Sequence, residues 1–296
     1  MKGRWVFNQW PAPEAQDLAV LCLNYATDPA TKQRECALNQ PNKMYNLPYR
    51  KTSLRWLPDG CRPPPPATLV ERKPCMRKWL ANGKKVCTLG DSHLRYLSRA
   101  LKYWSESDVG AEFPAYGLDP LDNLKHEDLH MEQVSYYVEL WGTLPAEQIQ
   151  GKLAQCSVVF TSFGSWQMAL NASISNYVEQ LAAYTQVLAR LAQTGVHVVW
   201  VGIPAHGFNV ARTKPGCTDL RLAPVVATYD RLAYEMVHKY RIPFIDWWEP
   251  TVSLLEASQD SAHFSWNSPP GGLLLDKVVQ SLCAHTDAHA SRYLRI

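Results

Sequence analysis

The sequence predicts an α/β protein in which a parallel β-sheet lies between two layers of helices. From residue 84 onward, short apolar runs alternate with longer segments whose apolar residues recur at helical spacing. The region before it is interrupted by prolines and holds half of the cysteines. We therefore divide the chain into an irregular N-terminal lobe over residues 1–80 and a three-layer α/β/α domain over residues 81–296.

The composition is that of a globular protein with a full core. The chain has 296 residues, of which 46% are hydrophobic and 19% charged, enough to bury the core of one large domain with a smaller appendage. Its net charge of +3 is small and no long run of Lys or Arg occurs, so we expect no nucleic-acid partner. No apolar stretch reaches about 18 residues, so we expect no transmembrane segment.

The cysteines of the N-terminal lobe predict disulfides. The lobe is rich in proline and has too little regular structure to be held together by packing alone, a common setting for disulfides in secreted proteins. Zinc is the alternative, but the sequence has no close C-x-x-C pair and no histidine at ligand spacing, so we expect no metal. The cysteines concerned are Cys22, Cys36, Cys61 and Cys75.

The remaining cysteines and a glycosylation motif bear on the cellular compartment. Cys87 and Cys156 border or enter predicted strands and are interpreted as buried free thiols, while Cys217 and Cys283 are candidates for a further bridge. The segment Asn171-Ala172-Ser173 is an N-glycosylation sequon. We therefore expect the secretory pathway, in the Golgi lumen or outside the cell, with a signal or anchor that is absent from this chain. A cytoplasmic protein is the alternative.

Only short elements are expected in the N-terminal lobe, because its prolines exclude long helices and strands. Residues 5–7 predict a strand, and residues 45–56 predict an extended or hairpin-like piece. The proline tract at 62–66 predicts a stiff spacer between the two parts of the chain. Residues 70–80 predict a short basic helix that leads into the sheet.

Five apolar runs predict the strands of the sheet, and helical segments connect them. The clearest helix covers 174–191, with one apolar face and Gly195 just beyond its end. Helical connections make the strands parallel, so functional residues are expected at their carboxyl ends. The predicted strands are 86–89, 134–141, 158–162, 197–202 and 242–247, and the predicted helices are 94–104, 174–191, 225–240 and 273–282.

A nucleophile is predicted in the turn between the first strand and the first helix. The turn reads Gly90-Asp91-Ser92-His93. Ser92 falls at the helix N-terminus, where unpaired N–H groups and the helix dipole favour a developing oxyanion. Asp91 is expected to fix the turn through hydrogen bonds to the backbone. A plain helix cap is the alternative interpretation of Ser92.

A general base and its orienting carboxylate are predicted near the other end of the chain. Asp260 precedes His263 by three residues, close enough on one turn for the carboxylate to hold one ring nitrogen and leave the other as a base. With Ser92, these residues complete a Ser-His-Asp triad, which is an arrangement for nucleophilic acyl transfer.

With these motifs in this order, the chain resembles the SGNH, or GDSL-like, hydrolase superfamily. Within it, the chain is similar to the PC-esterase group and its trichome-birefringence-like carbohydrate O-acetyltransferases, because Gly3-Arg4-Trp5-Val6, residues 54–61 and Arg95 also follow that group's pattern. The resemblance implies a flavodoxin-like sheet and acyl-ester chemistry on a carbohydrate with no cofactor. The acyl donor is left open.

The resemblance also implies an oxyanion hole. SGNH enzymes use the N–H of the serine, the N–H of a glycine after the second strand, and an asparagine from a Gly-x-Asn motif after the third. Gly142 and Gly164 stand at the two glycine positions, whereas Trp166 stands at the asparagine position. Arg95 and Gln167 are the candidates for the missing donor, and a surface salt bridge is the alternative for Arg95.

Substrate contacts are predicted at the same edge of the sheet. Trp166 and Trp266 have indole faces that can stack on sugar rings, with a place in the core as the alternative. Gln167 and His206 lie in segments that follow predicted strands. We therefore predict O-acetyl transfer to or from a carbohydrate through an acyl-enzyme. An esterase is the first alternative, and a glycan-binding module without turnover is the second.

Overall fold

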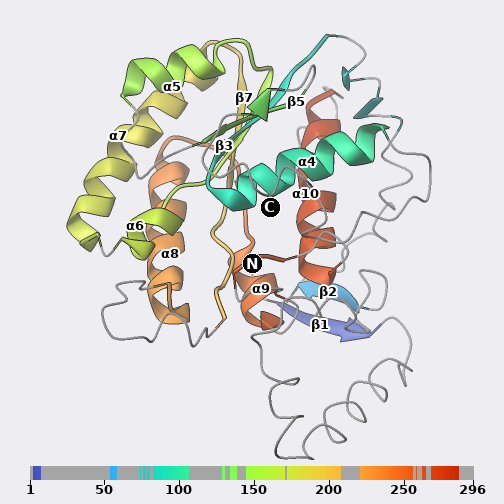
Figure 1. The fold of residues 1–296 in the computed structure, drawn as a ribbon, viewed down its shortest axis with the longest axis vertical. Coiled ribbons are helices and arrows are strands. Elements are labelled where there is room, and N and C mark those ends of the chain that lie inside the picture. Colours follow the sequence, from blue (N-terminus) through green and yellow to red (C-terminus); the bar gives the residue numbers. More distant parts are fainter. Residues whose placement is uncertain are drawn as a thin grey trace, which may run out of the picture.

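A six-stranded β-sheet forms the centre of the protein in the computed structural model (Figure 1). Every neighbouring pair of strands is parallel except β4 with β5. In spatial order the strands are β4 (Leu129–His130), β5 (Val134–Val138), β3 (Val86–Gly90), β6 (Val158–Thr161), β7 (His197–Val201) and β8 (Phe244–Ile245). The structure describes residues 3–7, 54–58, 74, 76–77, 79–80, 83–106, 129–130, 134–138, 145–170, 172–207, 221–255, 258, 262–264 and 268–286.

The parallel strands have the order of a doubly wound sheet. By their place in the sequence they lie second, first, third, fourth and fifth, which is the order of flavodoxin-like folds. The predicted three-layer α/β/α class with a flavodoxin-like sheet is therefore confirmed. In this topology the strand order reverses between β3 and β6, and ligands bind outside the carboxyl ends of strands at such a point.

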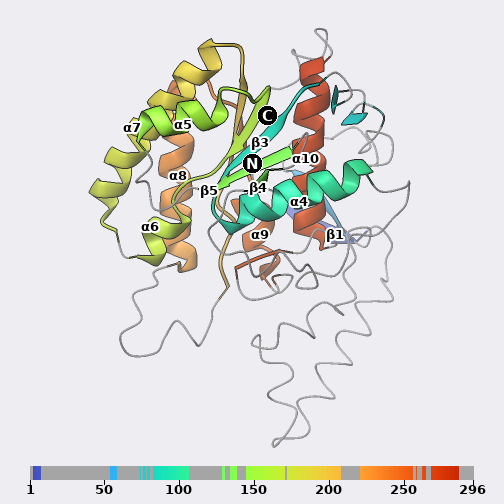
Figure 2. The ribbon, with the colours of Figure 1, turned by 45° about the horizontal axis from the view of Figure 1, so that its top comes forward.

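Helices cover both faces of the sheet (Figure 2). The sheet has a hydrophobic core on each face, and alternate residues of a strand point to opposite cores. Val86 belongs to one core and Cys87 to the other. Because both faces are buried, the strands are apolar along most of their length, and this made them recognisable in the sequence. One face is covered by α4 (Ser92–Glu106) and α10 (Pro269–Thr286), and the other by α5 (Ala146–Leu153), α7 (Ile174–Gln193) and α8 (Ala223–Lys239).

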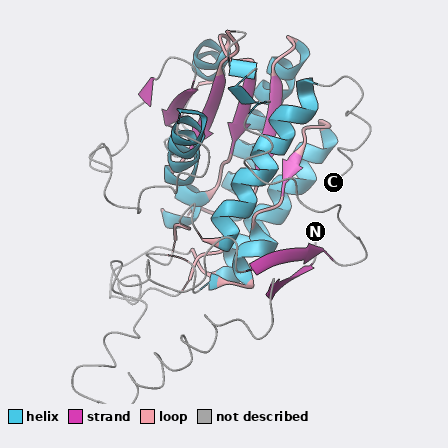
Figure 3. Cartoon of the chain, turned by 90° about the vertical axis from the view of Figure 1, so that its right-hand side faces the viewer, coloured by secondary structure: helices cyan, strands magenta, loops and turns pink. Residues whose placement is uncertain are grey.

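A small two-stranded sheet stands apart from the main one (Figure 3). Its strands β1 (Gly3–Phe7) and β2 (Leu54–Pro58) pair antiparallel. β1 lies beside the short helix α9 (Trp248–Val252), and β2 lies beside α10. The strand predicted at 5–7 is confirmed. The cysteines and the proline tract of the N-terminal lobe lie outside the described residues, so its disulfides stay a prediction.

Most predicted elements of the α/β/α domain lie close to their predicted positions, and the clearest differences are in β8 and α10. The strand predicted over 242–247 is reduced to β8, because the Asp246 carboxylate accepts a hydrogen bond from an N–H in the first turn of α9. Helix α10 begins at Pro269, earlier than predicted, because prolines fit the first turn of a helix and Ser268 accepts hydrogen bonds from two glycine N–H groups. The short helices α5, α6 (Ser165–Ala169) and α9 are not predicted from the sequence.

The structure overturns one prediction about cysteines. Cys87 in β3 and Cys156, just before β6, form a disulfide, so their interpretation as free thiols is wrong. The cause is the pairing of β3 with β6 as neighbouring parallel strands, which brings the two sulfur atoms together. Cys283 also forms a disulfide. Its partner lies outside the described residues, so the predicted pairing with Cys217 stays a prediction.

Candidate active site

Ser92 lies at the carboxyl end of β3, as the first residue of α4. The chain turns directly from strand to helix through Gly90 and Asp91. A side chain at Gly90 would lie 3.0 Å from the carbonyl oxygen of Ser162, beyond the end of β6, and equally close to Leu94. Such contacts are tighter than ordinary packing, so glycine is needed for this close approach. The turn places the Ser92 hydroxyl at a helix N-terminus, with its unpaired N–H groups and positive dipole end.

His263 reaches Ser92 from the segment between α9 and α10. Its Nε2 lies 2.6 Å from Ser92 Oγ, although the two residues are 171 positions apart. Ser258 supports this segment, since its hydroxyl donates to the His263 carbonyl at 3.1 Å and its backbone forms a β-bridge with Phe264. Both members of the Ser92–His263 pair are partly exposed. A hydroxyl and an imidazole therefore meet where a substrate can reach them.

His93 joins the same two segments by a second route, which the sequence does not predict. Asp91 Oδ1 accepts a hydrogen bond from the His93 backbone N–H at 2.9 Å and lies 3.0 Å from His93 Nδ1. On the other side of the ring, His93 Nε2 lies 3.0 Å from the carbonyl oxygen of Ala262. The expectation that Asp91 fixes the turn through a backbone hydrogen bond is confirmed.

Asp91 and His93 form a buried ion pair. Burial alone would raise the pKa of Asp91, but the charge and hydrogen bonds of His93, together with the nearby Ser165 hydroxyl, hold it well below its ordinary value. Burial alone would lower the pKa of His93, but the charge of Asp91 and the hydrogen bonds to Asp91 and Ala262 give a net rise. The His93 ring lies beside His263, with 4.8 Å between the ring centroids.

Arg95 is buried in α4 and is therefore not a surface residue. Its Nη2 donates to the Tyr96 hydroxyl at 3.2 Å, and the guanidinium lies 5.1 Å from the centroid of the Tyr96 ring. Tyr96 in turn meets the ring of His263 edge-on, with 5.1 Å between centroids. The sequence does not identify Tyr96 as a site residue, because its contact with His263 depends on how the segment that carries His263 packs.

The segments after β6 and β7 bring further candidates to this end of the sheet. Gly164, at φ 133°, precedes α6, which carries the half-buried Trp166 and the buried Gln167. Neither polar atom of the Gln167 amide has a hydrogen-bond partner among the described residues. After β7, His206 is buried, and its ring centroid lies 5.5 Å from that of His93.

Three predicted site residues, Asp260, Gly142 and Trp266, lie outside the described residues, so their roles stay predictions. Across the described ranges, no group of three or more His, Cys, Asp or Glu side chains is placed to hold a metal ion. Within the part of the chain that the structure describes, no helix has the length and apolar character needed to cross a membrane.

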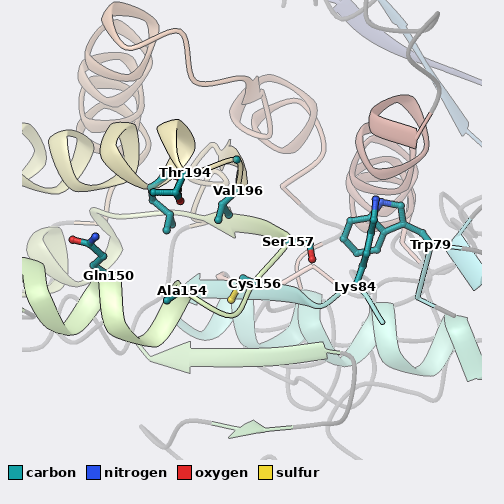
Figure 4. Close-up of a pocket in the computed structure, with 10 residues that line it drawn as sticks. Trp79, Lys84, Gln150, Ala154, Cys156, Ser157, Thr194 and Val196 are labelled. Carbon is teal, nitrogen blue, oxygen red and sulfur yellow. Dashed lines mark hydrogen bonds between the residues drawn. The ribbon is translucent and has the colours of Figure 1, made fainter. Parts of the chain in front are cut away.

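A separate hollow of about 540 Å³ lies at the other end of the sheet (Figure 4). Its wall includes Ser157 and Val196, which immediately precede β6 and β7, with Trp79 and Lys84 opposite. Ser92 follows the carboxyl end of the neighbouring parallel strand β3. This hollow is therefore distinct from the Ser92–His263 pair.

Comparison of the chain with protein-family models gives no match, and comparison with curated proteins gives none either. Among solved structures, the chain is similar to a GDSL-like lipase from Bacteroides thetaiotaomicron, with 13% identity over 74% of this chain and 100% of the other, and a TM-score of 0.43. It is also similar to an acetyl xylan esterase, with 11% identity over 69% of this chain and 100% of the other, and a TM-score of 0.37. A third is a catalytic mutant of an acetylxylan esterase from Geobacillus stearothermophilus, with 12% identity over 68% of this chain and 94% of the other, and a TM-score of 0.38.

Proposed function

We propose that the protein is a serine-dependent enzyme of acyl-ester chemistry, with Ser92 as nucleophile and His263 as general base. The proposal rests on the 2.6 Å contact between Ser92 Oγ and His263 Nε2, which is within hydrogen-bond reach of a nucleophile and its base. Ser92 also stands at a helix N-terminus, and both side chains are partly exposed. A serine that merely caps its helix needs no histidine from the far end of the chain.

The proposed reaction passes through an acyl-enzyme. Ser92 Oγ attacks the carbonyl carbon of the ester while its proton passes to His263 Nε2. The tetrahedral intermediate collapses when the same nitrogen protonates the leaving alkoxide, which leaves the acyl group on Ser92. An acceptor hydroxyl then gives its proton to His263 and attacks the acyl carbon, and His263 returns the proton to Ser92 Oγ as the bond between Ser92 and the acyl group breaks. Asp260 is proposed to orient His263 through Nδ1.

The oxyanion of the tetrahedral intermediate needs preorganised donors beside Ser92. The backbone N–H groups of Ser92 and Gly142 are the proposed first two, with Gly164 and the Arg95 side chain as further candidates. Gln167 is a candidate for the missing donor or for a substrate contact. Its buried amide supports such a role, because leaving a buried polar group unpaired costs about 1–3 kcal/mol unless a ligand satisfies it.

The proposed acyl group is acetyl, and the proposed partner is a carbohydrate, which makes the protein an O-acetyltransferase. This part of the proposal is supported by the resemblance to the PC-esterase group within the SGNH superfamily, which rests on Gly3-Arg4-Trp5-Val6, residues 54–61 and Arg95. Trp166, Trp266 and His206 are the proposed contacts to the sugar. If water takes the place of the sugar hydroxyl, the same acyl-enzyme gives ester hydrolysis, which is the alternative activity.

The secretory pathway is the proposed location. The buried Cys87–Cys156 disulfide supports it, because disulfides persist in oxidising compartments and are rare in the cytosol. Because this disulfide lies inside the main domain, it supports the secretory pathway separately from the disulfides predicted in the N-terminal lobe.

Turnover of an activated acetyl ester, with and without added oligosaccharides, tests the proposal. Wild-type protein should move acetate onto an oligosaccharide, and Ser92→Ala should abolish this activity. Ser253→Ala is the control, because the Ser253 hydroxyl donates only to carbonyls of its own helix α9 among the described residues. Free acetate as the sole product would select the esterase. Oligosaccharide binding without turnover, equal in wild type and Ser92→Ala, would overturn the proposal in favour of a glycan-binding module.

A further inference from the structure

His93 is buried beside His263, but the proposed reaction of Ser92 and His263 gives it no chemical step. It is the second residue of α4 and is only 4% exposed. Aromatic rings from three other segments enclose it, with centroid distances of 5.7 Å to Trp247, 5.5 Å to His206 and 4.8 Å to His263. This packing holds the ring in one orientation and keeps it away from a substrate.

Hydrogen bonding decides the protonation state of the His93 ring. The carbonyl oxygen of Ala262, 3.0 Å from Nε2, can only accept, so Nε2 carries a proton. The ionised carboxylate of Asp91, 3.0 Å from Nδ1, also accepts, so Nδ1 carries a proton too. The raised pKa of His93, in which the charge of Asp91 outweighs burial, agrees with this state. With both nitrogens protonated, His93 cannot act as a base.

The two hydrogen bonds of His93 connect the same two segments of the chain as the Ser92–His263 contact. Asp91 precedes Ser92, and Ala262 precedes His263. The tie between His93 and Ala262 therefore joins segments 169 residues apart, next to the contact that joins residues 171 apart. Moving the Ala262 peptide away from His93 would move His263 as well, because the two residues share a peptide bond.

We infer that His93 is a positioning residue, which ties the peptide of Ala262 to Asp91 in the nucleophile turn and thereby sets the distance between Ser92 and His263. Its effect on catalysis rests on the proposed function, whereas the tie itself does not. Loss of the tie should slow acylation and deacylation alike, because both steps use His263. Substrate affinity should stay unchanged, because the buried His93 is not available to a substrate.

Two substitutions and one control separate this role from a general structural one. His93→Phe keeps an aromatic ring and removes both side-chain hydrogen bonds, while His93→Gln keeps a donor for the Ala262 carbonyl. His197→Phe is the control, because His197 is a partly buried histidine at the opposite end of the sheet that lies 3.4 Å from the Ser281 hydroxyl. Circular dichroism and thermal unfolding establish that each variant is folded, and His93→Gln carries the test if His93→Phe is not.

The kinetic expectation is a change in kcat at constant KM. With an activated acetyl ester, kcat of His93→Phe should fall by about 100-fold and KM should stay within about twofold, because a displacement of about 1 Å between catalytic groups costs about that factor. His93→Gln should recover part of the loss. His197→Phe should keep both constants.

Two measurements need no turnover. Nitrogen-15 NMR of the wild type should show protons on both ring nitrogens of His93 at neutral pH, and Asp91→Asn should remove this state. Hydrogen exchange at the backbone of 262–264 should be faster in His93→Phe than in wild type, and unchanged in His197→Phe.

A folded His93→Phe with unchanged kcat and unchanged exchange at 262–264 overturns the inference, as does a neutral His93 ring in the wild type. If the wild type shows no acylation of Ser92, the proposed function fails. The exchange and NMR results then show by themselves whether the hydrogen bond between His93 and Ala262 holds the two segments together.

Discussion

Replacing Asp230 by asparagine should stabilise the protein by an amount that grows with pH. Asp230 lies on α8, is 7% exposed, and its Oδ1 accepts a hydrogen bond from the Ile203 N–H at 2.7 Å. It packs so closely on Gly202 that a Cβ there would lie 2.9 Å from the same oxygen. Burial raises the pKa of Asp230 to about 8, with the Ile203 hydrogen bond opposing the rise and the charge of Asp246 adding to it.

The sign of the effect follows from the ordinary pKa of 3.8. Between about pH 4 and pH 8 the unfolded chain has lost the Asp230 proton and the folded protein keeps it, so the free energy of unfolding falls as pH rises. The slope approaches about 1.4 kcal/mol per pH unit, with an upper limit of about 6 kcal/mol over the whole window. Below that window the carboxyl is protonated in both states, and above it the carboxyl is ionised in both.

Urea unfolding of Asp230→Asn and wild type at pH 5, 6, 7, 8 and 9 measures this difference. The asparagine oxygen can still accept from the Ile203 N–H, so the variant should gain about 1 kcal/mol over wild type for each pH unit up to pH 8 and then level off. Glu235→Gln is the control, because this exposed residue of the same helix pairs with an exposed Arg231. Stability curves of Asp230→Asn and wild type that run parallel from pH 5 to pH 8 would refute the reasoning.

Further substitutions test the packing of the α/β/α domain. Replacing Cys87 and Cys156 together by alanine should lower the free energy of unfolding by about 4 kcal/mol, the chain-entropy value for a bridge between residues 69 apart. Urea unfolding checks it, and a loss below about 1 kcal/mol contradicts it. Gly164→Ala should cost about 2 kcal/mol or more, since Gly164 has φ +133° and an added Cβ would lie 2.8 Å from Ile203 Cδ1. Gly195→Ala, at φ +94° with open space around it, should cost less, and equal losses in urea unfolding would exclude a steric contribution.

The fold could be predicted where burial leaves a direct pattern in the sequence. The parallel strands β3, β6 and β7 are covered on both faces, so they appear as apolar runs with no polar alternation. The end of β8 could not be predicted in this way, because a single hydrogen bond, from the Glu249 N–H to the Asp246 carboxylate, decides it. The Cys87–Cys156 bridge depends on which strands are neighbours, and the spacing of cysteines along the chain does not give that order.

The residues of the candidate site also fall into those that could be predicted from the sequence and those that could not. Ser92 and His263 could be predicted, because each lies in a short motif whose chemistry needs the other. His93 could not, because its partner Ala262 contributes a backbone carbonyl, and any residue type would provide one. The burial of Arg95 could not be predicted either, since it depends on how α4 packs against other segments and not on spacing within the helix.

Labelling with a fluorophosphonate probe, read by intact mass and peptide mapping, tests the Ser92–His263 pair most directly. The probe bonds to a serine oxygen whose proton a base has taken, and a positioned base contributes about 100-fold or more to such a step. We predict a single adduct on Ser92, slower by about that factor in His263→Gln and absent in Ser92→Ala. Folded wild-type protein that takes up no probe at Ser92, or His263→Gln that labels at the wild-type rate, would contradict the account.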